Sequence, residues 1–459
     1  MKVFIAMILF LSPLLRAGDF TNYNTSNSGL SGNKVKAIVV DAGGNKWFGT
    51  DQGLSAFDGV NWVTYIKDDE KQTLADNDIN DLAFEFGSFG PELWIATANG
   101  ASVMGIAAID AVTKATPYRR DNTGLLDNEV TAVAVDTLRG ERWFGTRKGV
   151  SRFAADGWRS FTTETEPALA WNDVTAIGVD ADSGWKYICT QNGPPDFNGV
   201  SRLHSMPGDI DAVTAPSPYN VEWSGLYSAN VFSIFVDVDG TQWFGTDAGF
   251  AYHDTTETKA YWDVFTVDEG LIHDKVNALL KSDDGIAWIG TDAGLDRFDY
   301  QFGEYGIEIY KFTHFTTADG LADNHINDIV LDRDGSLWIA TNNGVSHYTG
   351  KTTVQKKRNA APVKSCGLVG NWPNPFNPAT AIRYNLESFS HVELYIVNMR
   401  GERIRTLVNT NQSAGVHETT WNGLLTAGQG APTGIYIAII EIETANGLFR
   451  DSIKMLLVK

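Results

Sequence analysis

Cysteine and histidine are scarce in this sequence, which has two cysteines and eight histidines among 459 residues. The cysteines, Cys189 and Cys366, lie far apart, and no histidine or cysteine cluster has the spacing of a zinc site. Two isolated thiols do not make the disulfide framework of a small secreted domain. We therefore expect two unpaired thiols, no metal site and no cofactor.

Positive charge is also in short supply. The chain has 36 lysines and arginines against 56 aspartates and glutamates, which leaves a formal net charge of -20. Because an acidic chain repels phosphate groups, this balance excludes nucleic acid as a partner.

Long apolar runs are nearly absent. The one candidate, residues 3–15, follows a lysine and is shorter than the roughly 20 apolar residues that span a membrane. This pattern is typical of a secretory signal peptide, here residues 1–18. We expect a mature chain that has no transmembrane segment and is secreted or held at the cell surface.

One motif, by contrast, is written seven times. Near copies of "WIGTDAGLDRFD" (288–299) include "WFGTDQGLSAFD" (47–58) and "WFGTDAGFAYH" (243–253). A spacing of roughly 44 to 56 residues is typical of four-stranded propeller blades, which must stack to bury both faces. The sequence therefore predicts a seven-bladed β-propeller over residues 19–350. The first residues of the seven copies are Trp47, Trp94, Trp143, Tyr187, Trp243, Trp288 and Trp338.

The two ends of this repeat region complement each other. The last repeat ends at "GVSHYTG" (344–350) without an aromatic fourth strand, whereas "DFTNYNTSNSGL" (19–30) has the pattern of that strand. We predict that residues 19–26 pair with blade seven, which leaves no exposed sheet edge at the closure.

The remaining chain predicts a second, smaller domain. Residues 351–364 are polar and basic and resemble a linker. Residues 365–459 alternate apolar and polar positions between Gly and Asn turns, which indicates a small immunoglobulin-like β-sandwich. The predicted fold class is thus all-β, a propeller followed by a sandwich.

The repeat "DRDGSLWIATNNGVSHY" (332–348) and its partners resemble the two-component-regulator propeller repeat. In that family, tandem repeats form the extracellular sensor of membrane-bound histidine kinases, many of which respond to polysaccharide fragments. The chain departs from those receptors because it has no transmembrane or kinase segment. The resemblance implies a propeller fold but not the same signalling.

The tail is similar to the C-terminal sorting domain of the type IX secretion system and to the immunoglobulin-like domain of flagellar hook-capping proteins. The resemblance rests on "NPFNP" (374–378), "VNMRGERIRTL" (397–407), "TGIY" (433–436) and "KMLLVK" (454–459). It implies export across the outer membrane with the type IX secretion machinery as partner. The motif residues we single out are Asn374, Pro375, Phe376, Asn377, Pro378, Gly434, Tyr436, Lys454 and Lys459.

Aromatic residues in and beside the insertions of blade four make a candidate ligand site. If they share one face, they form a strip of the kind that stacks on sugar rings, since large apolar groups on loops need a reason. The alternative is that they pack the inserted loops onto the ring. The four residues are Trp171, Phe197, Trp223 and Tyr227.

Aspartates recur in the turns and loops of the same face. Asp is common in turns because its side chain binds nearby amides, and no loop has calcium-ligand spacing, so calcium has only weak support. The aspartates are Asp51, Asp78, Asp127, Asp173, Asp247, Asp274, Asp292 and Asp323.

Evidence for catalysis is thin. His273 and His325 precede equivalent strands and are candidate acid/base groups, but no nucleophile elbow or phosphate loop is present. The sequence favours an exported, non-catalytic propeller that binds a carbohydrate or a surface protein through its loop face. A secreted polysaccharide-active lyase or hydrolase, and a structural surface protein with only protein contacts, stay open as alternatives.

Overall fold

The computed structural model divides the chain into two compact units, Met1–Val354 and Gln355–Lys459, and each is described here by itself. The predicted signal peptide and linker lie outside the described residues. The described residues are 19–457 without 42, 69–73, 88–89, 114–115, 166–167, 182, 195–197, 207–208, 215–218, 220–225, 238–239, 255–260, 283–284, 304–305, 351–366, 373–375, 377, 387–388, 399, 401, 414, 427–428 and 445–446.

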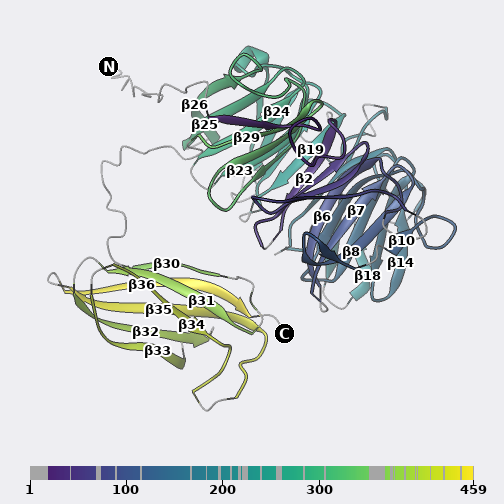
Figure 1. Ribbon diagram of the computed structural model, residues 1–459. Coiled ribbons are helices and arrows are strands. Elements are labelled where there is room, and N and C mark those ends of the chain that lie inside the picture. Colours follow the sequence, from purple (N-terminus) through teal and green to yellow (C-terminus); the bar gives the residue numbers. More distant parts are fainter. Residues whose placement is uncertain are drawn as a thin grey trace, which may run out of the picture. The chain divides into compact units, whose positions relative to one another are not determined.

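The described residues of the first unit form seven antiparallel sheets, which we call blades 1 to 7 (Figure 1). Blade 1 consists of β2 (Val35–Val40), β3 (Lys46–Thr50), β4 (Gly53–Phe57) and β5 (Trp62–Tyr65). Blade 2 consists of β6 (Ile79–Gly87), β7 (Gly90–Thr97), β8 (Gly100–Ala108) and β10 (Thr116–Tyr118), and β9 (Ala111–Val112) also pairs with β8. Blade 3 consists of β11 (Val130–Asp136), β12 (Glu141–Thr146), β13 (Gly149–Ala154) and β14 (Gly157–Phe161).

The later blades repeat this order. Blade 4 consists of β15 (Val174–Val179), β16 (Trp185–Thr190), β17 (Val200–Met206) and β18 (Asp209–Thr214). Blade 5 consists of β19 (Val231–Val236), β20 (Gln242–Thr246), β21 (Gly249–Asp254) and β22 (Tyr261–Phe265), and a short 3-10 helix, η1 (Val267–Glu269), follows it. Blade 6 consists of β23 (Val276–Ser282), β24 (Ile286–Thr291), β25 (Leu295–Gly303) and β26 (Gly306–Phe315). Blade 7 consists of β27 (Ile326–Leu331), β28 (Leu337–Thr341), β29 (Gly344–Tyr348) and β1 (Phe20–Tyr23).

The first strands of the blades form a closed ring. Each contacts the first strand of the next blade, in the order β2, β6, β11, β15, β19, β23, β27 and back to β2. The outermost strand of blade 7 precedes blade 1 in the sequence: β1 pairs antiparallel with β29, with Phe20 opposite Tyr348 and Tyr23 opposite Val345. The ring therefore joins both ends of its own sequence within one sheet, inside the segment 19–26 that the sequence indicated.

The aromatic residues of the repeat are buried between blades. Six of the seven are tryptophans exposed by 2% or less, and Tyr187 takes the place of the seventh. A second recurrent anchor is a leucine in the loop that leads into each blade, and every one of these side chains is buried. The leucines are Leu30, Leu74, Leu125, Leu169, Leu226, Leu271 and Leu321.

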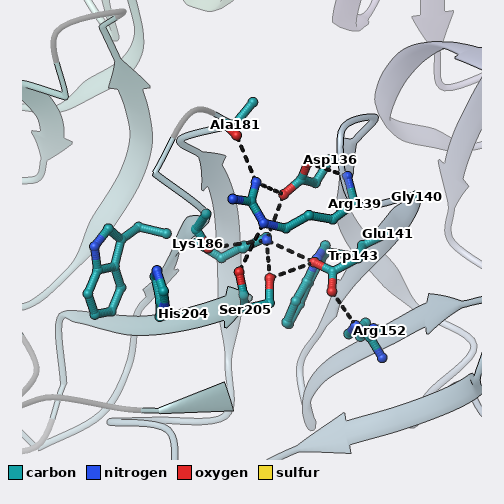
Figure 2. A network of polar contacts seen from close by, with 12 residues as sticks. Asp136, Arg139, Gly140, Glu141, Trp143, Arg152, Ala181, Lys186, His204 and Ser205 are labelled. Atoms are coloured by element: carbon teal, nitrogen blue, oxygen red, sulfur yellow. Dashed lines mark hydrogen bonds and ion pairs between the residues drawn. The ribbon is translucent and has the colours of Figure 1, made fainter. Parts of the chain in front are cut away.

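Buried ions join the ends of blades 3 and 4 (Figure 2). The Lys186 ammonium is fully buried and lies 2.7 Å from Asp136 Oδ2 and 2.8 Å from Glu141 Oε2. Glu141 also accepts hydrogen bonds from Trp143 Nε1 at 3.1 Å and Arg152 Nε at 2.7 Å. Burial favours the protonated Glu141, but hydrogen bonds and attraction from Lys186 and Arg152 prevail and lower the pKa of this carboxyl.

The second unit is a β-sandwich with a single main core. One sheet has the order β30 (Gly367–Trp372), β31 (Thr380–Leu386), β34 (Gly415–Trp421), and the other β33 (Arg403–Gln412), β32 (Ser390–Asn398), β35 (Gly434–Thr444), β36 (Gly447–Leu457). Trp421, Tyr384 and Phe376 lie in the core between alternate apolar residues of both sheets. The alternation read from the sequence thus places one face of each sheet inward.

No helix in the described part of the chain is long and apolar enough to cross a membrane.

Candidate functional site

The upper face of the propeller is the set of sheet ends that carry the turns between second and third strands and the loops into the next blade. We call the opposite ends the lower face. Repeated hydrogen bonds build the upper face: in six blades a threonine donates to a glycine carbonyl three residues later, as Thr246 does to Gly249 over 2.7 Å. In five blades a serine hydroxyl on the third strand accepts a loop N–H. We call these shared contacts the scaffold, and we call a residue that replaces one of the contacting residues a departure from it.

A second repeated contact links the inner strands. In five blades the second residue of the inner strand donates a side-chain hydrogen bond to the first carbonyl of the next inner strand, as Asn80 does to Val130 over 2.9 Å and Asn327 to Val35 over 2.7 Å. Blade 1 has Lys36 at this position, which donates to the side chains of Asp78 and Asn80 instead. Blade 5 has Phe232 at this position and cannot make the bond. The Lys275 ammonium of blade 6 lies instead 5.3 Å from the centre of that ring.

Most of the predicted aspartates are occupied by neighbouring side chains or amides. Within the described residues, no group of three or more His, Cys, Asp or Glu side chains is arranged to hold a metal ion. Asp51 differs, because its Oδ1 atom is buried without a hydrogen-bond partner. The other contacts are Asp78 with Lys36, Asp127 with Lys148, Asp173 with Arg147 and Asn192, Asp247 with Ser228 and Asn230, Asp274 with the Val267 N–H, and Asp323 with the His325 N–H.

Three nitrogen donors surround the Asp292 carboxylate on the upper face of blade 6. Its carboxylate accepts Asn277 Nδ2 at 2.7 Å and lies 3.1 Å from His325 Nδ1 and 3.3 Å from Lys275 Nζ. Burial opposes its ionisation, but these donors prevail and lower the pKa of Asp292. The carboxylate therefore stays ionised and fixes one nitrogen of His325. The other predicted histidine, His273, accepts the Lys275 N–H through Nδ1 at 3.0 Å.

An aspartate–histidine pair that the sequence did not predict lies on blade 6. Asp296 replaces the serine found on the third strand of five other blades, is fully buried, and accepts the Ile272 N–H at 2.7 Å in the serine's place. His314, opposite it on β26, binds Asp296 through Nδ1 and leaves much of its ring exposed. Burial raises the pKa of Asp296. The only signal for this pair was the departure of both residues from the repeat.

The predicted aromatic strip is only partly described. Phe197 and Trp223 lie outside the described residues, so their position is not part of the site. Trp171 is half-buried and packs so closely over Gly193 that a side chain there would collide with its ring. Tyr227, in contrast, is 63% exposed on the loop that leads into blade 5.

The inserted loop of blade 4 is mounted on the common scaffold. Thr190 donates to the carbonyl of Gly199 over 2.8 Å, the same bond as in the other blades but across a longer segment. Buried Asn198 and the loop residue Asn230 connect it to the start of blade 5. Asn192 adopts a left-handed backbone, φ 60°, which Asn tolerates better than most residues.

Two aspartates on inner strands have pKa values well above the usual range of a carboxyl group. Burial raises the pKa of Asp81 to about 7 and that of Asp328 to about 6, and Asp328 adds repulsion at Asp81. Each still accepts an N–H from the following blade, Val133 for Asp81 and Ile38 for Asp328, both at 2.8 Å. They lie on the strands that flank blade 1, and the sequence analysis did not single them out.

The sorting-motif residues that the structure describes serve the fold of the second unit. Phe376 and Tyr436 are buried, and both pack against Trp421. Gly434 begins β35 with a left-handed φ of 156°, while Pro378 and Lys454 are exposed. Asn374, Pro375, Asn377 and Lys459 lie outside the described residues.

Two family models match parts of the chain. The two component regulator propeller model matches residues 320–343, and the FlgD Ig-like domain model matches residues 377–446. The chain carries a regulator-propeller repeat and an Ig-like domain. The resemblances to the propeller repeat and to the Ig-like domain are confirmed, whereas the sorting-domain resemblance stays a prediction, and no curated protein matches the chain.

Solved structures share this fold. The extracellular domain of the hybrid two component system BT3049 from B. thetaiotaomicron matches 96% of this chain and 57% of its own, with a TM-score of 0.57 and 17% identity. PorZ, a surface component of the type-IX secretion system of Porphyromonas gingivalis, matches 94% of this chain and 60% of its own, with a TM-score of 0.53 and 16% identity. The chain thus spans about three fifths of the length of these two. At such identities the likeness confirms the fold class, a propeller followed by an Ig-like domain.

Streptogramin B lyase is similar over the propeller part. It matches 72% of this chain and 96% of its own, with a TM-score of 0.50 and 14% identity. An extracellular domain of a two component system, a surface component of a secretion system and an enzyme share this architecture, so function must be argued from the residues of the upper face.

Proposed function

We propose that this chain is an exported, non-catalytic binding protein that recognises a carbohydrate or a surface protein through the upper face of blades 4 to 7. One observation carries the proposal: most of the residues that depart from the shared scaffold gather there, Lys36 of blade 1 being an exception. Tyr227 is exposed, Phe232 replaces a bridging polar residue, and blade 4 carries an inserted loop. Loops on a rigid scaffold are where binding residues are commonly placed.

Exposed aromatic and polar groups together supply the contacts that such ligands need. Tyr227 offers a ring face, and half-buried Trp171 offers an edge beside the inserted loop. Asp292 and Lys275 offer an acceptor and a donor close to Phe232. A sugar hydroxyl or a polypeptide amide can bind this combination, whereas a flat polar face offers neither stacking nor apolar contact.

A glycan array and a surface-protein pull-down, both with the full chain, test this proposal. Tyr227→Ala and Trp171→Ala should each weaken binding at least tenfold while the unfolding temperature is preserved. Phe302→Ala is the matched control, because Phe302 is 51% exposed on the lower end of blade 6. Binding that is unchanged in both upper-face variants, or lost equally in the control, would refute the site.

We also propose that the Ig-like unit is a sorting domain for type IX secretion, with that machinery as the partner. The match of residues 377–446 to an Ig-like family and the likeness to PorZ support it. A fusion of residues 351–459 to a periplasmic reporter should reach the outside of a cell with this pathway. A reporter retained in the periplasm, although folded, would contradict the assignment.

The alternative function, a polysaccharide-active enzyme, draws on two Asp–His pairs: Asp296 with His314 in blade 6, and Asp292 of blade 6 with His325, which leads into blade 7. In each, a carboxylate binds Nδ1 and leaves Nε2 for a substrate proton. If polysaccharides bound by the chain yield shorter products, and His325→Gln or His314→Gln stops this, the enzyme replaces the binding protein as the function.

A further inference from the structure

The seven residues that immediately precede the inner strands form a ring of equivalent positions on the upper face, which we call the upper inner rim. In blades 1, 2, 4 and 6 the turn between second and third strands donates a backbone N–H to the rim carbonyl, for example Ala98 to Asp78 at 2.9 Å and Gln191 to Asp173 at 3.0 Å. In order of blades 1 to 7, the rim residues are Lys34, Asp78, Glu129, Asp173, Asn230, Lys275 and His325.

Charge is segregated around this rim. Blades 2, 3 and 4 contribute three consecutive acids, blade 5 contributes a neutral asparagine, and blades 6, 7 and 1 contribute three consecutive bases. A ring of seven places blade 3 nearly opposite blade 7. The backbone hydrogen bond from the turn uses only the carbonyl of the rim residue. The repeat therefore does not require any particular charge on the rim side chains.

Neighbouring counter-ions neutralise each half only in part. On the acidic side, Arg147 lies 2.9 Å from Glu129 and 3.3 Å from Asp173 and is shared between them. On the basic side, Lys275 and His325 share the single carboxylate of Asp292. On the acidic side, there are more rim carboxylates than cations that pair with them. On the basic side, there are more basic rim residues than carboxylates that pair with them.

Most rim side chains are accessible, but that of Asp173 is only 14% exposed and that of His325 is 32% exposed. The side chains of Asp78 and Glu129 are 42% and 44% exposed, and that of Lys275 is 37% exposed. Lys34 is exposed and has no ion-pair partner among the described residues. A ligand can therefore reach both halves without displacing the scaffold bonds.

Blade 5 separates the two halves with an uncharged rim residue and two aromatic rings, beside the exposed Asp247 carboxylate that Asn230 binds. Its rim residue, Asn230, carries no charge, its inner strand presents Phe232, and its loop exposes Tyr227. A ligand that spans from the acidic to the basic half along this side crosses aromatic residues on its way.

We propose that the upper inner rim binds a polypeptide segment with segregated charges, its basic residues on blades 2 to 4, its acidic residues on blades 6, 7 and 1, and an apolar residue over blade 5. This inference rests on the proposed function, because it assigns a ligand class to the same face. Polypeptides combine ammonium, guanidinium, carboxylate and aromatic groups in one chain, whereas a purely acidic glycan matches only one half of the rim.

Fluorescence anisotropy with the full chain and two labelled peptides tests the proposal. One peptide carries lysines at one end, tyrosine in the middle and glutamates at the other end; the second has the same composition with lysines and glutamates alternating. The segregated peptide should bind at least tenfold more tightly. Its affinity should fall as salt is added, because exposed charges are screened.

Variants of each half should remove this preference. The pair Glu129→Gln and Asp173→Asn, and the pair Lys34→Met and Lys275→Met, should each weaken the segregated peptide about tenfold and leave the alternating peptide unchanged. Asp110→Asn and Lys311→Met, charges away from the rim, are the matched controls and should have no effect.

Two results separate this inference from the function on which it rests. If both peptides bind equally, or neither binds while a glycan or surface protein binds in a manner that Tyr227→Ala weakens, the charge-segregated ligand is wrong and the binding face stands. If no peptide, glycan or surface protein binds the upper face, both proposals fail.

Discussion

The junction between blades 3 and 4 is closed by buried ions, whereas the junctions from blade 5 to blade 7 are closed by aromatic rings. In the first, Lys186 from blade 4 inserts between Asp136 and Glu141 of blade 3, and Trp143 donates to Glu141. In the second, the position equivalent to Lys186 is apolar, Ala287 in blade 6 and Leu337 in blade 7.

Ion pairs join two further junctions, although one ion pair, Lys281 with Asp237, also links blades 5 and 6. Arg142 meets Glu85 at 2.6 Å between blades 3 and 2, and Lys46 meets Asp332 at 2.6 Å between blades 1 and 7. Glu85 and Asp332 also accept the tryptophan N–H of their own blades. We call these junctions, with that of blades 3 and 4, the ionic side.

On the aromatic side, the indole nitrogens of Trp243 and Trp288 are buried without hydrogen-bond partners. Trp243 packs instead 5.3 Å from Tyr300, and Trp288 packs 5.4 Å from Tyr348 of the next blade. One backbone thus tolerates two junction chemistries, but they differ in vulnerability. An ionic junction depends on a complete set of partners, while an aromatic one depends on buried area.

The largest effect should come from breaking the ionic set. Lys186→Met removes the one cation that touches both Asp136 and Glu141, and buried carboxylates that lose a partner are costly. We expect the free energy of unfolding of the propeller to fall by about 3 kcal/mol, measured by chemical denaturation with tryptophan fluorescence. A loss below about 1 kcal/mol would mean that the buried ions behave like surface pairs.

A change of pH should act chiefly through two buried aspartates of the ionic side, and the raised pKa of Asp296 in blade 6 acts in the same direction. Asp81 and Asp328 have folded-state pKa values raised to about 7 and about 6, so the folded state binds more protons than the unfolded state below these values. Stability from these groups is therefore fully present in acid and is lost as pH rises through about 6 to 7. We expect the free energy of unfolding to be about 2 kcal/mol higher near pH 5 than near pH 8.

The double variant Asp81→Asn and Asp328→Asn should remove this slope, although its stability at any one pH is lower. Denaturation curves at several pH values measure it. A wild-type slope of the opposite sign would show that the lowered pKa of Glu141, whose contribution is lost as pH falls, dominates instead.

A smaller difference should separate two equivalent tryptophans. Trp143→Phe loses ring area and the 3.1 Å bond to Glu141, whereas Trp243→Phe loses ring area and removes an unpaired buried N–H. We expect Trp143→Phe to cost about 1 kcal/mol more than Trp243→Phe. Equal losses would indicate that the hydrogen bond to Glu141 adds nothing to the ionic junction.

The scaffold was predictable because it is repeated. Seven copies of one motif fix the burial of residues such as Trp47 and the position of turns such as Thr246 to Gly249, since each copy must meet the same neighbours. The closing strand was visible for the same reason, because the last copy lacked a part that the first residues supply.

The site was less predictable, because side chains from different blades build it. Nothing in sequence spacing indicates that His325 reaches Asp292, or that Lys186 reaches Glu141. Departures such as Asp296 for serine and Phe232 for asparagine or threonine are visible in the sequence. They acquire meaning only when the register shows which residues they face.

We propose that the upper-face departures of blades 5 and 6 serve binding and not stability. The free energy of unfolding of a variant that restores the repeat, with Phe232→Asn, Asp296→Ser and His314→Thr, tests this proposal. Because each new residue has a bonded counterpart in another blade, we expect stability that is unchanged or higher. A loss of more than about 2 kcal/mol would contradict it, because the departures would then belong to the fold.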